Sequence, residues 1–169
     1  MKMNADLEAA FNSHITAEFA STYNYLQMSA WFDSQHLLGF AQWMRTQADE
    51  EWVHGMRFYD HVLERGNDIK LQSVPAPQHE FTSCLQVFES ALENEREVSK
   101  KIHELFELAT ANNDYPSYSL LQEFIDEQVE EESTMEHIVA RLKLTGNNPP
   151  ALLMLDQELA QRTKVKSGN

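Results

Sequence analysis

Apolar residues recur at three- and four-residue spacings along most of the chain, which is the pattern of amphipathic helices. Pro is absent from residues 1–74, and no alternating strand pattern occurs. The start of the third helix is marked by a capping box at Ser83 and Gln86. The ends of the second and fourth helices are marked by Gly66 and Gly146. The pattern predicts four long helices and a short fifth one, ALLMLDQELAQR, with a frayed tail TKVKSGN. The long helices are expected at about residues 4–35, 38–65, 83–111 and from the turn NNDYP to 145.

The lengths of the links between the helices predict how the helices are arranged. Tight turns near His36 and Asp114 make the first two and the last two long helices antiparallel pairs. The middle link of roughly sixteen residues reaches about 50 Å when extended, and a helix of about 27 residues is about 40 Å long. The link can therefore run along the whole bundle, and the second and third helices lie parallel. The sequence thus predicts an all-α four-helix bundle with one long crossover, formed as one domain over residues 1–169.

Each of the four apolar stripes carries a carboxylate near its middle. The distance from Glu18 to Glu51 is 33 residues and from Glu18 to His54 is 36. The same two intervals, 33 and 36, recur between Glu95 and Gln128 and between Glu95 and Glu131. The repeated spacing places all six side chains at one level of the bundle, because a helix rises about 1.5 Å per residue. We expect them to converge in the core.

Buried carboxylates repel one another unless cations lie between them. Internal salt bridges are the alternative explanation, but the stripes contain no Lys or Arg to complete them. Oxygen ligands with a single imidazole favour iron or manganese over the metals that thiolates bind. Four carboxylates, one imidazole and one amide are enough for two ions that share a bridging carboxylate. The pattern therefore predicts a metal pair in the core.

The overall composition narrows the classes of partner. The net charge of −14 argues against nucleic acid, because phosphate binding requires clustered Lys and Arg. The first residues lack an apolar signal core, and no stretch is long enough to span a membrane. Cys84 is the only cysteine, so a disulfide framework is not expected. A cytoplasmic protein is the simplest interpretation.

Four segments spread along the chain resemble bacterial non-haem ferritin. They are YLQMSAW, DEEWVH, NNDYPSY and DEQVEEE, and the resemblance covers essentially the whole chain. It implies a ferritin-like fold and a ferroxidase that oxidises Fe(II) with dioxygen and stores the ferric mineral. It also implies a homo-oligomeric cage of 24 chains, a number that composition and periodicity do not show.

The resemblance also implies roles for individual residues. Glu18, Glu51 and His54 would bind the first iron, with Glu51 bridging to a second iron that Glu95 and Glu131 hold. Gln128 would adjust a hydrogen bond beside the pair. A third iron site would consist of three further glutamates, which are Glu50, Glu127 and Glu130. These three flank the stripes, and solvated surface charges are the alternative for them.

Departures from related families limit the choice within the superfamily. DEQVEEE provides no second ExxH, unlike bacterioferritin and the di-iron oxygenases. Trp52 stands where bacterioferritin carries its haem-ligating Met, so no haem is expected. The alternatives left open are a di-iron oxygenase acting on an organic substrate and a cage subunit without a working ferroxidase site.

Two further polar residues lie on the stripe of the first helix. Tyr25 follows Glu18 by seven residues on the same face, where it can reach the metal pair. The resemblance suggests a hydrogen bond or electron donation there, and a core Tyr with a satisfied hydroxyl is the equal alternative. His14 precedes Glu18 by four residues and is interpreted as a core histidine rather than a ligand.

Overall fold

The computed structural model describes residues 1–146 and 148–161 and contains five helices, with no strand in that part of the chain. The predicted boundaries agree with it to within about two residues at most ends, which is the usual uncertainty of a helix end. The predicted behaviour of the tail TKVKSGN, at residues 163–169, lies outside the described residues. The helices are α1 (Ala5–Ser34), α2 (Leu38–Glu64), α3 (Cys84–Ala111), α4 (Tyr115–Thr145) and α5 (Pro149–Leu159).

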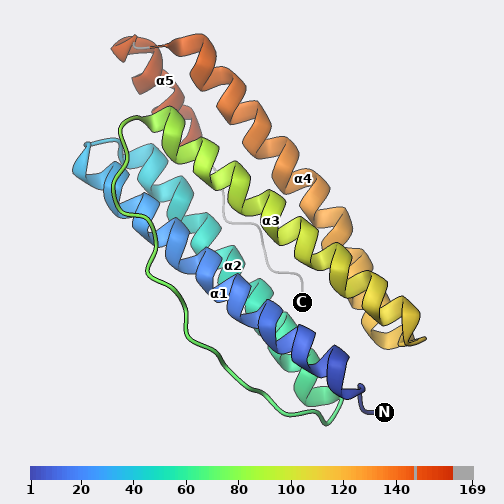
Figure 1. The fold of residues 1–169 in the computed structure, drawn as a ribbon. Coiled ribbons are helices and arrows are strands. Elements are labelled where there is room, and N and C mark those ends of the chain that lie inside the picture. Colours follow the sequence, from blue (N-terminus) through green and yellow to red (C-terminus); the bar gives the residue numbers. More distant parts are fainter. Residues whose placement is uncertain (147, 162–169) are drawn as a thin grey trace.

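The helices pair as two antiparallel hairpins joined by one long crossover (Figure 1). Both tight turns contain a residue with positive φ, His36 at 60° and Asn113 at 53°. Gly66 follows α2 with φ of 72°, a conformation that glycine adopts without strain. The crossover then runs back along α1, so that α2 and α3 lie parallel (Figure 1). The predicted bundle topology is confirmed.

Side chains of α1 hold the start of the crossover in place. Asn12 donates from Nδ2 to the carbonyl of Asp68 at 2.9 Å and accepts at Oδ1 from the amide of Lys70 at 2.6 Å. Asn67 accepts at Oδ1 from the amide of Met3 at 2.8 Å. The start of the crossover has no secondary structure, but these side chains provide hydrogen-bond partners for its backbone amides and carbonyls.

The capping box predicted for α3 is present in a shifted form. Ser83 Oγ accepts from the amide of Gln86 at 3.1 Å, as predicted. The side chain of Gln86 returns to the amide of Thr82 at 2.7 Å, one residue earlier than in the standard box. The backbone amides of Thr82 and Gln86 at the start of the helix therefore both have hydrogen-bond acceptors.

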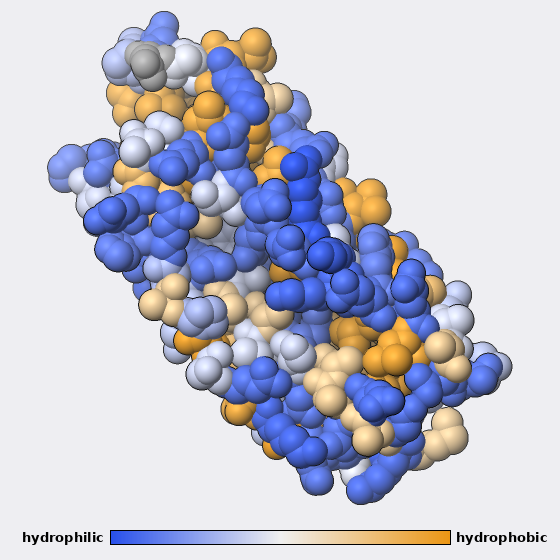
Figure 2. Space-filling model, viewed as in Figure 1, coloured by the Kyte–Doolittle hydropathy of each residue, from blue (hydrophilic) through white to orange (hydrophobic). Residues whose placement is uncertain are grey.

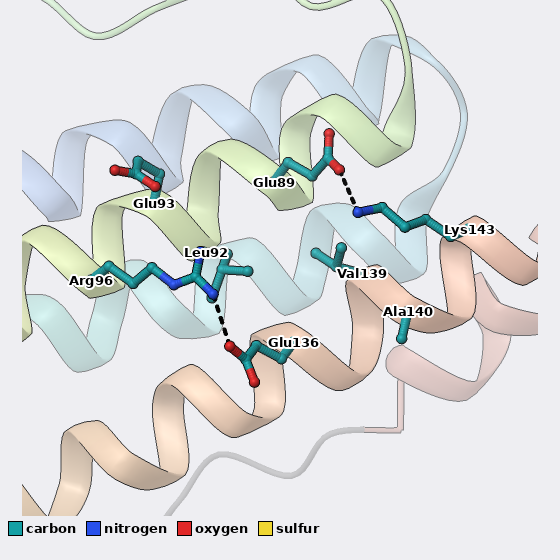
Figure 3. A pocket seen from close by; sticks show the side chains of 8 residues that line it. All are labelled: Glu89, Leu92, Glu93, Arg96, Glu136, Val139, Ala140 and Lys143. Carbon is teal, nitrogen blue, oxygen red and sulfur yellow. Dashed lines mark hydrogen bonds and ion pairs between the residues drawn. The ribbon is translucent and has the colours of Figure 1, made fainter.

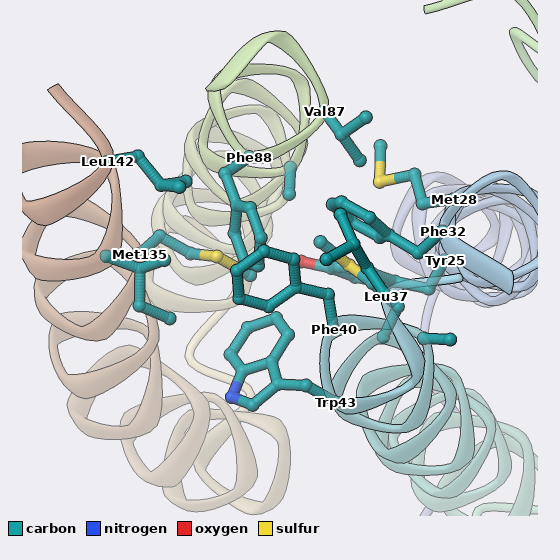
Figure 4. Packing of buried hydrophobic residues seen from close by; sticks show 14 of the residues in the cluster. Tyr25, Met28, Phe32, Leu37, Phe40, Trp43, Val87, Phe88, Met135 and Leu142 are labelled. Carbon is teal, nitrogen blue, oxygen red and sulfur yellow. The ribbon is translucent and has the colours of Figure 1, made fainter. Parts of the chain in front are cut away.

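The apolar core consists of two clusters that lie toward opposite ends of the bundle. One contains Tyr25, Phe32 and Phe88, and the aromatic rings of Phe32, Phe40 and Phe88 interlock there with centroids 5.1 to 5.5 Å apart (Figure 4). The other contains Leu7, Phe11, Phe58 and Phe124. On α1 the two clusters are separated by the segment that carries Glu18. The middle of the bundle is therefore the place where the core becomes polar.

On the outer face of the second hairpin, ion pairs connect α3 and α4 (Figure 3). Arg96 contacts Glu136 at 2.8 Å, and Lys143 contacts Glu89 at 2.9 Å. They line a surface groove whose charged side chains largely pair with each other. Exposed pairs of this kind contribute little to stability, typically below about 1 kcal/mol.

No described helix contains an apolar stretch long enough to cross a membrane.

The fifth helix packs against the beginning of α2. Leu37, the residue before α2, provides no side-chain cap, and Asp156 of α5 accepts instead from the amide of Phe40 at 2.8 Å. The approach is close, because a Cβ added to Gly39 would lie 1.9 Å from the carbonyl oxygen of Asp156. Only glycine fits there. A side chain 116 residues away in the sequence therefore caps the helix.

We predict that Asp156→Ala destabilises the protein by about 1 kcal/mol, the usual cost of losing a helix cap. Denaturant unfolding measures the change. Asp156→Asn keeps an acceptor oxygen and should retain most of the stability. Equal stability of the Ala variant and the unsubstituted protein would contradict the capping role.

Candidate metal centre

The structure brings the predicted mid-bundle residues together from the four long helices. Glu18 comes from α1, Glu51 and His54 from α2, and Glu95 from α3, and all four are buried. On α4, Gln128 is buried and Glu131 is half buried. The side chains lie between the two apolar clusters, where ionised groups are costly without a counter-charge.

Three of these residues form a group with the geometry of a metal site. One ligand atom each of Glu18, Glu51 and His54 lies within 4.8 Å of the other two. Among the described residues this is the only group of three or more such side chains that meets this distance. The pair Glu51 and His54 is one helical turn apart on α2, with Nδ1 of His54 3.9 Å from Oε2 of Glu51. Nδ1 therefore faces the carboxylates and is the nitrogen available to a metal.

The second nitrogen of His54 faces away from the group. Its Nε2 lies 3.3 Å from Oε1 of Glu127 on α4, and Arg57 lies 3.5 Å from the other oxygen of Glu127. A histidine that binds a metal usually donates its other N–H to a carboxylate, which fixes the ring and its tautomer. Glu127 is placed for that task.

Glu95 is oriented by two hydrogen-bond donors. The hydroxyl of Tyr25 donates to Oε1 of Glu95, and Gln128 donates from Nε2 to Oε2 at 3.1 Å. Gln128 also lies 3.2 Å from Oγ of Ser99. On the α2 side, Gln47 donates to Oε2 of Glu131 at 3.1 Å. Both carboxylates predicted for a second ion are thus held by neutral donors.

The electrostatics of the cluster show how crowded the negative charge is. Burial, reinforced by the charges of Glu95 and Glu18, raises the pKa of Glu51 well above its usual range. Burial likewise raises the pKa of Glu95 to about 7. Glu18 behaves differently: burial raises its pKa, but the neighbouring His14 and His54 outweigh this and hold the pKa below its usual value. Ionising Glu51 beside Glu18 and Glu95 is therefore costly, and a bound cation would offset that cost.

Close packing of α1 against α2 brings Glu18 to Glu51 and His54. A Cβ added to Gly55 would lie 2.7 Å from the ring of Phe19 and 3.3 Å from Cβ of Glu18. A larger residue at this position would force the ring of Phe19 to shift beside the cluster. Gly55 was not singled out in the sequence, where a single glycine inside a helix gives no specific signal. Gln47 was also missed, although an amide on an apolar stripe was an available signal.

The three residues predicted for a third iron site lie at the edge of the cluster. Glu50 and Glu127 are half buried, and Glu130 is exposed. Glu127 is engaged with His54 and Arg57, and the hydrogen bond with His54 is the main reason why its pKa is lowered. The structure does not gather the three carboxylates into one group at metal-binding distance within the described residues.

Comparisons with known proteins agree on the family. Residues 8–145 match the ferritin-like domain family. The bacterial non-heme ferritin of Staphylococcus haemolyticus is 37% identical over 161 residues, which cover 95% of this chain and 97% of that protein.

Solved structures give the same result. An open pore ferritin from the hyperthermophilic archaeon Archaeoglobus fulgidus is 44% identical, with a TM-score of 0.94, and the match covers 96% of this chain and 100% of that one. A humanized archaeal ferritin gives a TM-score of 0.95 at 43% identity, covering 97% of this chain and 99% of that one. Because the family match spans most of the sequence and the relatives align over nearly all of it, this chain belongs to the ferritin family.

Proposed function

We propose that the protein stores iron and is a ferroxidase, oxidising Fe(II) with dioxygen at a di-iron site and depositing the ferric product. The observation that supports this most is the group of Glu18, Glu51 and His54, whose ligand atoms lie within 4.8 Å of one another. Within the described part of the chain, no Lys or Arg forms an ion pair with these glutamates. Fe(II) as substrate would provide the missing positive charge.

The arrangement suggests a division of labour between the residues. Glu18 and Nδ1 of His54 would bind the first iron, and Glu51 would bridge to a second iron held by Glu95 and Glu131. Each Fe(II) gives up one electron, so a pair supplies the two electrons that, with two protons taken from water, convert dioxygen to hydrogen peroxide. Carboxylate ligands favour the ferric product, because hard oxygen donors bind the more highly charged ion better. Tyr25 and Gln128 would hold Glu95 in place through their hydrogen bonds.

Helix α4 distinguishes this site from that of a di-iron oxygenase. It offers Gln128 and Glu131 at the level where a second ExxH motif would place another imidazole. A cage subunit without a working site would be expected to have lost ligands, and Glu18, Glu51, His54 and Glu95 are all present. Neither alternative gains support from the geometry.

We further propose that the chain assembles into a homo-oligomeric cage of 24 subunits, in which the mineral is stored. Apolar patches interrupt the hydrophilic face in Figure 2. Several large apolar side chains are strongly exposed on the isolated chain, with Leu144 at 87% and Met154 at 71%. Exposed apolar surface of this kind marks interaction sites.

We also propose that the protein is cytoplasmic. The free thiol of Cys84 is compatible with that reducing compartment.

We predict that Glu51→Ala abolishes the fast phase of Fe(II) oxidation and leaves folding and assembly intact. A bridging ligand serves both ions, whereas in the iron-free protein the substitution removes a crowded buried carboxyl group. Stopped-flow absorbance of the ferric product measures the rate, and size-exclusion chromatography measures assembly. Glu64→Ala, which removes an exposed acid from the same helix, is the control and should oxidise iron normally. A wild-type rate in the Glu51 variant would refute the bridging assignment.

The third site, formed by Glu50, Glu127 and Glu130, is a separate proposal. Its support is position: Glu127 and Glu130 are one turn apart on α4, and Glu127 reaches His54. A cation there would be held more weakly than the pair, because Glu130 is exposed to solvent. It could serve iron on its way to or from the pair.

We expect Glu130→Ala to keep the first fast oxidation of two irons per chain and to change the rate of later turnovers. Repeated additions of Fe(II) followed by stopped-flow measurement separate the two stages. Asp126→Ala removes another exposed acid of α4 and serves as the control. If both variants behave like the unsubstituted protein throughout, these glutamates are surface charges only.

A further inference from the structure

His14 is a buried imidazole that contacts the candidate metal centre and has no role in the function proposed above. It lies on α1, one turn before Glu18, and only 2% of its surface is exposed. Its Nε2 is 2.7 Å from Oε1 of Glu18. The N–H direction is not yet aligned for a full hydrogen bond, and among the described residues Nδ1 has no hydrogen-bond partner. Nε2 of His14 and Oε1 of Glu18 are therefore in contact inside the core without a completed hydrogen bond between them.

Aromatic rings hold the imidazole in that position. The ring of His14 packs edge-on against Phe58 of α2, with centroids 4.4 Å apart. Phe58 in turn stacks on Phe124 of α4 at 4.3 Å, and Phe124 also contacts His54 at 5.3 Å. The same pair of phenylalanines thus contacts both imidazoles, His14 through Phe58 and His54 through Phe124. A ring packed in this way has little freedom to turn away from Glu18.

His14 does not belong to the ligand group itself. The side chains whose ligand atoms approach within 4.8 Å of one another are Glu18, Glu51 and His54, within the part of the chain that the structure describes. Among the acids that the structure describes, His14 forms an ion-pair contact with Glu18 alone, from the side nearer the N-terminus of α1. Its nitrogen therefore contacts one carboxylate of the group without belonging to the group.

We propose that His14 is a positioning residue that donates from Nε2 to Oε1 of Glu18 and so leaves the other oxygen to face the metal. The proposal rests on the metal site proposed above. Carboxylates that bind metals are themselves held by hydrogen bonds, and loss of such a partner typically weakens metal binding about 10- to 100-fold. Hydrogen bonds at such sites are often poorly aligned before the ligand binds, and a small rotation of the Glu18 carboxylate would complete this one.

The test compares Zn²⁺ binding by the full-length protein and three variants, by competition with a chromophoric chelator. His14→Phe keeps an aromatic ring against Phe58 and removes the donor, so Zn²⁺ affinity should fall at least about tenfold. His14→Gln restores an N–H donor of similar reach and should return affinity close to that of the unsubstituted protein. His61→Phe is the matched control: it replaces an imidazole that stacks on Phe11 at 5.4 Å and contacts Ser117 rather than Glu18. Its Zn²⁺ affinity should not change.

The outcomes separate this inference from the proposed function. If the unsubstituted protein binds Zn²⁺ tightly and His14→Phe binds it equally well, His14 is only a packing residue and the metal site stands. If His14→Gln is as weak as His14→Phe, the donor is not what matters and the proposal fails. X-ray absorption of Zn²⁺ in the unsubstituted protein should show one imidazole ligand per chain, and a second would make His14 a ligand instead. No tight Zn²⁺ binding at all would overturn both the metal site and the role of His14. Should His14→Phe not fold, His14→Met, also without a donor, takes its place with the same expected loss.

Discussion

Burial of carboxylates in the middle of an apolar bundle is the costliest feature of this protein, and the surrounding helices are arranged around it. Glu18, Glu51 and Glu95 are all at most 1% exposed, and no Lys or Arg among the described residues pairs with them. Burying an unpaired ionised carboxylate costs several kcal/mol, on the order of the net stability of a whole domain. The raised pKa values of Glu51 and Glu95 are the direct consequence. A bound cation is the simplest way in which the same cluster becomes favourable.

The remaining architecture provides what this cluster needs. The two apolar clusters on either side supply the burial that stabilises the bundle. Gly55 lets α1 and α2 approach closely at the level of Glu18, and neutral donors from Tyr25, Gln47 and Gln128 hold the outer carboxylates. The α5 helix, through Asp156, completes the start of the helix that carries Glu51 and His54. Residues from separate helices thus fix the positions of the carboxylates and the imidazole in the cluster.

The helices and their topology were predictable because periodicity, caps and link lengths are local properties. The convergence of Glu18, Glu51, His54 and Glu95 was also predictable, since equal spacings on paired helices place side chains at equal heights. The hydrogen-bond partners of the candidate ligands were not predictable, because they depend on how the helices rotate against each other. Examples are Glu127 behind His54 and Asp156 at the amide of Phe40. His14 was interpreted as an ordinary core histidine, and only the distance of 2.7 Å to Glu18 suggests a further role. The assignment of ligands, and the extent of one domain over residues 1–169, stay predictions.

If the buried carboxylates hold two metal ions, a crystal of the protein soaked in Fe(II) without oxygen and measured at the iron absorption edge will reveal them. We expect two anomalous peaks per chain in the core, one among Glu18, Glu51 and His54 and one among Glu51, Glu95 and Glu131. A core without anomalous density, with iron bound only at surface carboxylates, would refute the metal pair.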